Sequence, residues 1–517
     1  MNREQSVKKG ALKWYHYLHV LLIPFFFFVH NYIDFYGLVS GKKLLPSLGW
    51  AFLSAGLLIA LFRLLFRNTS KAVLMTSVLL LIGFFSPSLM QLGEPAGLNR
   101  YSLFLPVLLL LVAGTFVFLW RRKTTPIRTH IFLTICFSVL LLVDFAMFIG
   151  KGPDRLKKDH QLTIVDAPQL KPVSVSADSL PDIYYLIFDA MPAADVAKEV
   201  LGVDLRPMES SLQQMGFVVQ HNVSSAAART HVSMFSNLNM GYPPFEDQQQ
   251  ISFKELHEAI KGMNENQLTT FLSAQGYKII NGGLFPLNND PGLYKTEDWI
   301  IRSPEDMIYN QTLWNRIARD FTWLQQWITG AGLVQRLNER IQKDVAYLKK
   351  TDALVRKTAE DPSGQPRFLY AHFNLPHGPY KFHSNGEMIQ WKSDEALSQA
   401  NRQQLTTDQL QYTTNLLPQL CNYILKHSKR KTIIIVQGDH GMRSKAVREK
   451  GEEYVFETFS ALYVPVQLQQ AIPDTLYTPN TFRIVLNEYF HQSLPLLQSR
   501  QFHLTYFKEE QIFRDEF

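Results

Sequence analysis

Three apolar segments of this chain run into side chains that can bind a metal ion. They are "DIYYLIF" (182–188) before Asp189, "RFLYAHFNL" (367–375) before Pro376 and His377, and "KTIIIVQG" (431–438) before Asp439 and His440. Two carboxylates and an imidazole form a ligand set suited to Zn²⁺ or Mn²⁺. Because open α/β sheets bind ligands beyond the carboxyl ends of their strands, we expect these distant groups to converge.

The adjacent Asp439 and His440 place a condition on the backbone. Successive residues of a strand point to opposite faces, so both side chains reach one ion only where the strand gives way to a loop. Gly438 and Gly441 permit this change. Two alternatives stay open: Asp189 could cap the helix "AADVAKEVL". His377 could be a turn histidine held between prolines.

The segment "SSAAARTHVSMFSNLNM" (224–240) offers a nucleophile. Small residues and Thr230 precede an apolar helical run, and the N-terminus of a helix holds anions such as phosphate or sulfate. A threonine hydroxyl is a weak nucleophile that a metal can activate. The alternative is an ordinary threonine N-cap. Arg443, four residues after Asp439, is a candidate anion contact, with a solvated surface arginine as its alternative.

The elements that must position these residues follow from hydrophobic patterning after residue 181. Short continuous apolar runs alternate with amphipathic helical patterns, which is typical of a parallel sheet covered on both faces. The sequence therefore predicts an α/β sandwich with a mainly parallel central sheet. The segment 304–358 reads as a helical insertion whose tryptophans and leucines we expect in the core.

The first 150 residues have a different composition. Five apolar stretches, each close to the ~20 residues that span a bilayer, lie at about 16–36, 47–66, 72–91, 102–121 and 129–149. The sequence thus predicts a membrane domain of about five helices over 1–150, a linker rich in charge, Pro and Ser over 151–180, and a catalytic domain over 181–517.

The basic residues predict the orientation of this membrane domain. With the N-terminus inside, ten Lys and Arg flank the cytoplasmic ends of the stretches and three lie in the outer loops, as the positive-inside rule requires. Lys151, Arg155, Lys157 and Lys158 after the fifth stretch point the other way, but they open a long translocated domain, where the rule weakens. An odd number of spans places everything after residue 150 outside the cytoplasm.

The overall charge of +7 comes from the membrane domain, so it does not indicate nucleic-acid binding by the rest of the chain. Cys136 and Cys421 are too far apart to form a plausible disulfide.

The order of Asp189, a threonine before "HVSMFSNL", "PHGPY" and "GDHG" resembles the alkaline phosphatase/sulfatase superfamily. With the apolar stretches in front, the chain looks like its membrane branch, the lipoteichoic acid synthases and lipid A phosphoethanolamine transferases. The resemblance implies that Asp189, Thr230, Asp439 and His440 bind a catalytic divalent metal. It also implies that Thr230 is the nucleophile and that His377 either binds the substrate phosphoryl group or assists the leaving group.

The resemblance implies that this chain is an enzyme. The implied activity is that of a membrane-anchored, metal-dependent phosphoryl transferase or phosphodiesterase acting through a covalent threonine intermediate. Its substrates would be phospholipid or envelope-glycan headgroups at the cell membrane, its catalytic domain extracytoplasmic, and its metal Zn²⁺ or Mn²⁺, with Mg²⁺ or Ca²⁺ as further options. One alternative is a sulfatase-like ester hydrolase, although the chain lacks the C/S-x-P-S-R stretch of formylglycine sulfatases. Another is a non-catalytic member that binds headgroups or a partner. The transferases usually carry Glu where this chain has Asp189.

Overall fold

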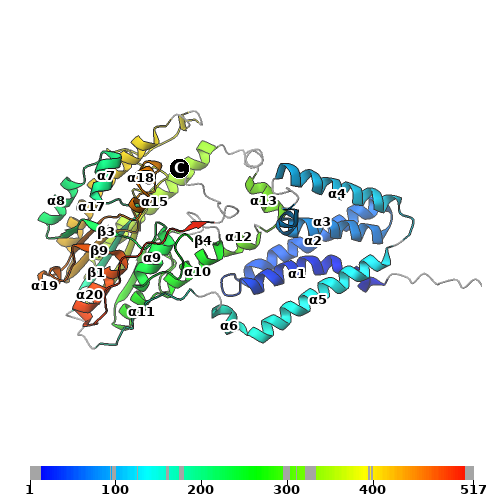
Figure 1. Ribbon diagram of the computed structural model, residues 1–517, viewed down its shortest axis with the longest axis horizontal. Helices are drawn as coiled ribbons and strands as arrows, with labels where there is room; N and C mark the ends of the chain where they lie inside the picture. The colour runs from blue at the N-terminus through cyan, green and yellow to red at the C-terminus, as the bar shows by residue number, and fades with distance from the viewer. Residues whose placement is uncertain are drawn as a thin grey trace, which may run out of the picture. The chain divides into compact units, whose positions relative to one another are not determined.

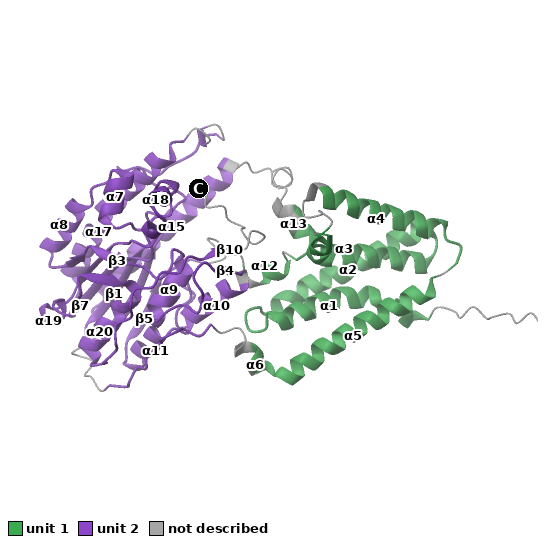
Figure 2. Ribbon diagram, viewed as in Figure 1, with its two compact units in different colours: residues 1–160, 302–330 green, residues 161–301, 331–517 purple. Residues whose placement is uncertain are grey.

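The computed structural model describes residues 13–93, 95, 101–124, 126–158, 162–173, 180–294, 303–309, 311–320, 333–393, 396–397 and 400–506 (Figure 1). The chain divides into two compact units (Figure 2). The helical unit comprises residues 1–160 and 302–330, and the sheet unit comprises residues 161–301 and 331–517.

The helical unit is built from long apolar helices. They are α1 (His19–Asp34) after the short η1 (Trp14–Tyr17), α2 (Gly41–Phe66), α3 (Thr69–Gly93), α4 (Tyr101–Arg121) and α5 (Ile127–Lys151), followed by α6 (Pro153–Lys158). Among the described residues, α2 to α5 are long and apolar enough to cross a membrane, and α1 is shorter at 16 residues. The sequence predicts five long spans, and the structure has four among the described residues, with α1 as a shorter fifth apolar helix. Leucine and phenylalanine side chains are exposed along α2, α4 and α5.

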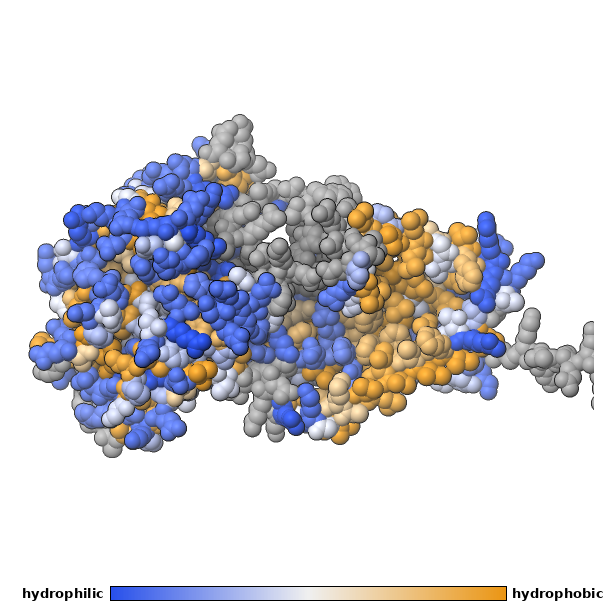
Figure 3. Space-filling view, viewed as in Figure 1, coloured by the Kyte–Doolittle hydropathy of each residue, from blue (hydrophilic) through white to orange (hydrophobic). Residues whose placement is uncertain are grey.

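The surface chemistry of the two units differs. On the face drawn in Figure 3, the helical unit is largely hydrophobic and the sheet unit mostly hydrophilic. Exposed apolar side chains on long helices are the pattern of a protein solvated by lipid. The helical unit therefore anchors the chain in a membrane.

A six-stranded sheet organises the sheet unit, in the order β2 (Val218–Gln220), β8 (Ser460–Tyr463), β7 (Thr432–Gly438), β1 (Asp182–Phe188), β6 (Arg367–Phe373) and β5 (Lys278–Gly282). The pairs β7–β1, β1–β6 and β6–β5 are parallel, whereas β8 is antiparallel to both of its neighbours. The predicted mainly parallel sheet is confirmed.

The central strands are buried on both faces, which explains their continuous apolar sequences. Alternate residues of β1 enter two different cores: Leu186 and Phe188 join one, and Tyr185 and Ile187 join the other. The first core is completed by α7 (Ala194–Leu201), α8 (Arg206–Gln214), α15 (Leu333–Glu360) and α17 (Arg402–His427). The second contains α9 (Thr230–Asn239), α10 (Phe253–Asn264), α11 (Gln267–Ala274) and α20 (Thr481–Phe490).

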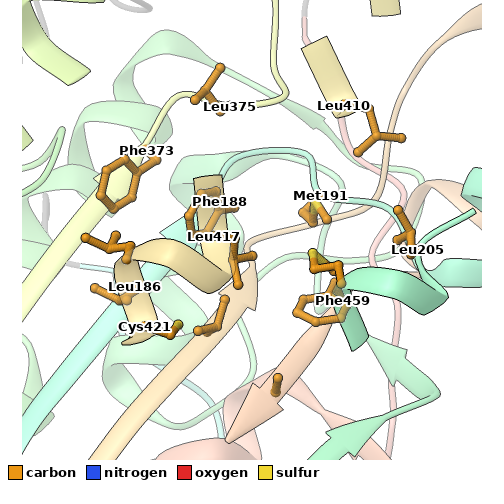
Figure 4. Close-up of a cluster of buried hydrophobic side chains, with 14 of the residues drawn as sticks. Leu186, Phe188, Met191, Leu205, Phe373, Leu375, Leu410, Leu417, Cys421 and Phe459 are labelled. Carbon is orange, nitrogen blue, oxygen red and sulfur yellow. The ribbon is translucent and has the colours of Figure 1, made fainter. Parts of the chain in front are cut away.

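The first core also holds one of the two cysteines. Figure 4 shows Cys421 of α17 among apolar side chains that include Leu186 and Leu417. Its thiol is fully buried, and this burial raises its pKa. Cys421 is therefore a core residue, as its place in the helical pattern suggests.

Shorter elements complete the sheet unit. β3 (Asn222–Ser224) pairs with β9 (Thr475–Tyr477), and β4 (Gln250–Ile251) pairs with β10 (Thr505–Tyr506). The remaining elements are α18 (Lys445–Lys450), η5 (Glu452–Val455), α19 (Val466–Gln469) and η6 (Thr478–Asn480).

The predicted insertion over 304–358 is divided between the two units. Its first helices, α12 (Pro304–Tyr309) and α13 (Leu313–Asp320), belong to the helical unit, whereas α15 packs on the sheet. The expectation that its tryptophans are core residues is wrong for Trp314, whose side chain is 77% exposed. Trp323 and Trp327 lie outside the described residues.

Candidate metal centre

Strand register brings two carboxylates to one point of the sheet. Phe188 at the end of β1 lies opposite Gly438 at the end of β7, so Asp189 and Asp439 are each the first residue past a paired position. The chain turns sharply here: Ala190 has a left-handed φ of 61° and donates its N–H to Asp439 Oδ1 at 2.9 Å. The ends of parallel strands thus bring together groups 250 residues apart, as the sequence predicts.

The two glycines that flank Asp439 and His440 are required for close packing. A Cβ at Gly438 would lie 2.1 Å from Thr458 Oγ1, and one at Gly441 would lie 2.3 Å from the Glu457 carbonyl. Neither Gly438 nor Gly441 has a positive φ. Both positions therefore require glycine because there is no room for a Cβ, and not because of the backbone conformation.

The side chains of Asp189, Asp439 and His440 are buried, and one donor atom from each lies within 4.8 Å of the others. His440 Nε2 is 3.4 Å from Asp439 Oδ2 and 3.8 Å from Asp189 Oδ1. Donor atoms about 2.1 Å from a tetrahedral ion are about 3.4 Å from one another. The spacing therefore fits the ligands of a single divalent ion.

Unsatisfied acceptors support the same conclusion. Both oxygens of Asp189 and Oδ2 of Asp439 are buried without a hydrogen-bond partner. Burying carboxylate oxygens without partners costs free energy. A bound cation would compensate both carboxylates at once, because their oxygens lie at the spacing of metal ligands. The residues present fit a divalent metal ion.

His440 is oriented to offer an unprotonated nitrogen. Its Nδ1 donates to the Gly441 carbonyl at 2.7 Å, which leaves the Nε2 lone pair facing the carboxylates and the Thr230 hydroxyl. Burial, followed by the charge of Arg443, lowers the pKa of His440 to about 3. The ring is therefore neutral at pH 7, the form in which histidine binds metals.

The two carboxylates differ in their titration. Burial opposes the ionisation of Asp189, but His377, His372 and His440 outweigh this effect and hold its pKa below the ordinary value. Burial and then repulsion by Asp189 raise the pKa of Asp439 well above the ordinary value. Two buried carboxylates at this distance disfavour a second negative charge, which again points to a cation.

Thr230 begins helix α9 beside this centre. Its Oγ1 lies 3.2 Å from His440 Nε2. Arg229 occupies the N-cap position without a side-chain cap hydrogen bond, so Thr230 is the first residue of the helix and not its N-cap. Asp189 is not a helix cap either, because α7 begins after Ala193. The alternatives that sequence patterns left open for these two residues are therefore excluded by the geometry.

His377 and Arg443 lie together next to the carboxylates. The His377 N–H donates to the Asp189 carbonyl at 3.2 Å, and its Nδ1 donates to the Gly378 carbonyl at 2.6 Å. Arg443 Nη2 donates to His377 Nε2 at 3.0 Å. Burial lowers the pKa of His377. The predicted substrate-binding pair is thus assembled in one place, and its role in binding remains a prediction.

Two buried residues that pattern analysis did not identify complete the surroundings. His372 on β6 directs Nε2 towards Asp189 Oδ2 at 3.6 Å, and its Nδ1 is 2.7 Å from the Tyr370 hydroxyl. Its Nε2 is buried and has no hydrogen-bond partner. A histidine inside the otherwise apolar strand "RFLYAHF" is a signal that could have identified it.

The second is Lys381, which holds the loop that carries His377. Its ammonium donates to the carbonyls of Asn374, His377 and Pro379 at 2.9, 2.8 and 2.9 Å. Gln409 of α17 accepts the Lys381 N–H at 2.6 Å and donates to the His377 carbonyl at 2.9 Å. Burial lowers the pKa of Lys381 to about 8. A buried lysine thus fixes the loop by its backbone.

Comparison with known proteins gives one family. Residues 183–465, more than half of the chain, match the model of the family described as Sulfatase. The matched range includes every residue of the centre described above. No curated protein sequence matches the chain.

The solved structures that the comparison finds are distant from this chain in sequence and have low TM-scores. The integral membrane lipooligosaccharide phosphoethanolamine transferase A from Neisseria meningitidis is 14% identical, covering 87% of this chain and 89% of that one with a TM-score of 0.33. The periplasmic domain of a phosphoethanolamine transferase from Campylobacter jejuni is 14% identical, covering 62% and 92% with a TM-score of 0.34. An alkaline phosphatase superfamily protein from Vibrio parahaemolyticus is 16% identical, covering 55% and 60% with a TM-score of 0.30.

Proposed function

This chain belongs to the sulfatase family, within the alkaline phosphatase/sulfatase superfamily of enzymes, and from this premise we propose that it is a membrane-anchored, metal-dependent phosphoryl transferase or phosphodiesterase. Thr230 is the proposed nucleophile, and Asp189, Thr230, Asp439 and His440 are the proposed metal ligands. His377 and Arg443 are the proposed contacts to the substrate.

The observation that carries this proposal is the position of the Thr230 hydroxyl. It lies at the first turn of α9, 3.2 Å from the unprotonated Nε2 of His440 and next to carboxylate oxygens that lack partners. The amino end of a helix attracts an anion through its free N–H groups. The Thr230 hydroxyl therefore lies where the helix N-terminus would bind the phosphoryl group of a substrate.

The residues define one balanced reaction. Thr230 Oγ forms a bond to phosphorus, the bond from phosphorus to the ester oxygen of the leaving group breaks, and the Thr230 proton passes to solvent water. The leaving oxygen takes up a proton, and the phosphoryl group is then passed to water or to an acceptor hydroxyl. Arg443 holds the non-bridging oxygens, and His377 joins it when its Nε2, which accepts from Arg443 in this structure, carries a proton. A bound divalent cation would supply positive charge at the attacking and phosphoryl oxygens.

Two features support phosphorus and a membrane-borne substrate. Nowhere does the sequence contain the C/S-x-P-S-R stretch from which formylglycine is made, and Cys421 is buried in the core. The four apolar helices confine the enzyme to a bilayer, where phospholipid or envelope-glycan headgroups are the available esters. We propose the extracytoplasmic side for the catalytic part, because basic residues flank the opposite ends of the helices. This side requires an odd number of crossings, so we propose that α1, the shorter apolar helix of 16 residues, crosses the bilayer as well.

The test is intact mass spectrometry of the full-length protein after brief reaction with bis(4-nitrophenyl) phosphate and acid quenching. We expect a covalent nitrophenyl-phosphoryl adduct on Thr230. Thr230→Ala should lose both the adduct and turnover, whereas Thr230→Ser retains a hydroxyl and should keep a measurable part of both. Undiminished turnover by Thr230→Ala would overturn the proposal.

A sulfuric ester hydrolase is the second candidate, and the family model itself favours it. The same preparation is assayed with 4-nitrophenyl sulfate beside the phosphodiester. Faster sulfate release, together with a sulfated rather than phosphorylated Thr230, would assign sulfatase activity instead.

A further inference from the structure

The α12–α13 segment (303–320) belongs to the helical unit although its sequence lies between β5 and β6 of the sheet. In Figure 2 both helices carry the colour of the helical unit. The chain therefore passes between the units three times, after residues 160, 301 and 330. A catalytic domain needs only one such connection, so the additional excursion requires an explanation.

Buried polar contacts fix α12 to the beginning of α2. Glu305 is only 4% exposed, and its carboxylate accepts from the Ser40 N–H at 3.4 Å and from Lys43 Nζ at 3.3 Å. The hydroxyls of Tyr309 and Ser47 are 2.9 Å apart. A buried carboxylate persists only where charged and hydrogen-bonding partners are supplied. The contact is therefore a specific attachment.

Apolar contacts place α13 against the apolar helices. Leu313 packs on a cluster formed by Ile82 of α3 with Phe104 and Leu108 of α4. At 1.5 Å per residue, Phe104 and Leu108 lie about 4 and 10 Å from the start of α4. The headgroup layer on each side of a bilayer is several Å thick. Leu313 thus lies near the boundary between headgroups and acyl chains.

The pattern of α13 suits this boundary. Leu313, Trp314 and Ile317 are spaced as one apolar side of the helix, and the other positions of "LWNRIARD" are mostly polar or charged. Leu313 and Ile317 are half-buried, whereas the Trp314 side chain is 77% exposed. Tryptophan is enriched at membrane interfaces, where its ring contacts lipid and its N–H contacts the headgroups.

We propose that α13 is an interfacial helix and that Trp314 contacts the bilayer at the headgroup boundary. The partner of this surface is the lipid itself, because α13 continues the apolar surface of α3 and α4. The segment between β5 and β6 thereby reaches the membrane at a second place along the chain, in addition to the apolar helices before residue 160. The proposal does not depend on the catalytic role of Thr230.

The test is the membrane depth of residue 314 in the full-length protein, reconstituted in phosphatidylethanolamine–phosphatidylglycerol vesicles. Trp314→Cys is labelled with a nitroxide in a Cys136→Ser background, where Cys421 is buried and unreactive. Oxygen and a nickel chelate then compete to relax the label. Leu110→Cys (72% exposed, on α4) is the lipid reference, and Leu496→Cys (47% exposed, in the sheet unit) is the water reference.

We expect the ratio of oxygen to nickel accessibility at position 314 to shift away from that of Leu496 towards that of Leu110. A ratio equal to that of Leu496, or protection from both reagents by a protein partner, would overturn the proposal. If Trp314→Cys fails to fold, benzoylphenylalanine at position 314 keeps an aromatic ring. Photolysis should then add the mass of a phospholipid, and a peptide adduct instead would contradict lipid contact.

Discussion

The two ends of strand β1 carry the same residue in opposite circumstances. Asp182 opens the strand and Asp189 follows it, and both side chains are fully buried. Asp182 Oδ2 is 2.7 Å from Arg367 Nη2, and its Oδ1 accepts the Arg367 N–H at 3.0 Å. Neither oxygen of Asp189 has a hydrogen-bond partner.

The difference separates a structural charge from a functional one. Arg367 also donates to the carbonyls of Thr358 and Asp361. At this amino end of β1, the closed end, both Asp182 oxygens therefore have donors, although Arg367 Nε has none. The carboxyl end leaves acceptors open and gathers histidines around them. A fold tolerates a buried, unpaired carboxylate mainly where a ligand completes it. Four substitutions can break or sharpen this comparison.

The largest effect is expected at the open end. Asp189→Asn should abolish stoichiometric metal binding and lower turnover at least ~10³-fold, since even one lost electrostatic contact to a reacting group costs 10²–10³-fold. The metal-free variant should unfold at no lower free energy than the metal-free wild type, because an unpaired buried charge has been removed. Metal content and urea unfolding in EDTA measure the two effects. Metal bound at full stoichiometry would contradict the assigned ligand.

The closed end should respond in the opposite way. Arg367→Met leaves Asp182 buried without its cation and should lower the unfolding free energy by about 3–5 kcal/mol. The folded protein should still bind metal with unchanged affinity. Asp182→Asn combined with Arg367→Met should recover part of the loss. Arg206→Met breaks a surface pair with Asp204 and is the matched control with almost no effect. A loss of metal affinity in Arg367→Met would show that the two ends of β1 are energetically coupled, which would contradict the comparison.

Lys381→Met tests whether the loop carrying His377 needs its buried ammonium. Three carbonyls lose a donor, at about 1–3 kcal/mol for each that finds no other partner. Displacing His377 by ~1 Å should lower turnover by about 10²-fold, with metal affinity retained. Urea unfolding and steady-state kinetics measure these effects. Lys445→Met, at an exposed lysine, is the control, and equal turnover in both variants would exclude a positioning role.

The sequence indicates the candidate residues of the open end, at the carboxyl end of β1, because their signals are local. Polar residues after continuous apolar strands indicate Asp189 and Asp439, and the helical run after Thr230 indicates a helix start. Strand order and register, which make these residues neighbours, depend on tertiary pairing. The same is true of Lys381, because a lysine is buried only when backbone carbonyls from a particular loop surround its ammonium.

The division of 304–358 between the units was beyond prediction for a related reason. Amphipathic helices in α12, α13 and α15 have similar patterns whether their apolar side meets a sheet or a membrane helix. Only partners distant in sequence, Lys43 for Glu305 and Phe104 for Leu313, decide between the two. The spacing of Trp314 fits either environment, so the sequence predicts a core position, whereas the side chain is exposed.

The smallest effect is expected from the strained turn that follows Asp189. Glycine at position 190 relieves about 1–2 kcal/mol of left-handed strain, but loses about 0.8 kcal/mol of buried methyl and ~0.5–1 kcal/mol of chain entropy. Ala190→Gly should therefore leave the unfolding free energy nearly unchanged. Glycine keeps the N–H that Ala190 donates to Asp439 Oδ1. The looser turn should therefore weaken metal binding by less than ~10-fold, below the cost of about 10–100-fold for removing an outer contact of a metal site.

Gln248→Gly is the matched control for this turn, since Gln248 is exposed and has a φ of 62° far from any proposed ligand in the sequence. It should relieve similar strain and leave metal affinity unchanged. Calorimetric titration with Zn²⁺ and urea unfolding compare the two variants. If Ala190→Gly binds metal as tightly as Gln248→Gly, the strained turn only connects β1 to α7. A weaker affinity in Ala190→Gly alone means that the left-handed turn holds Asp189 and Asp439 together. At the closed end, it is the side chain of Arg367 that holds Asp182 in place.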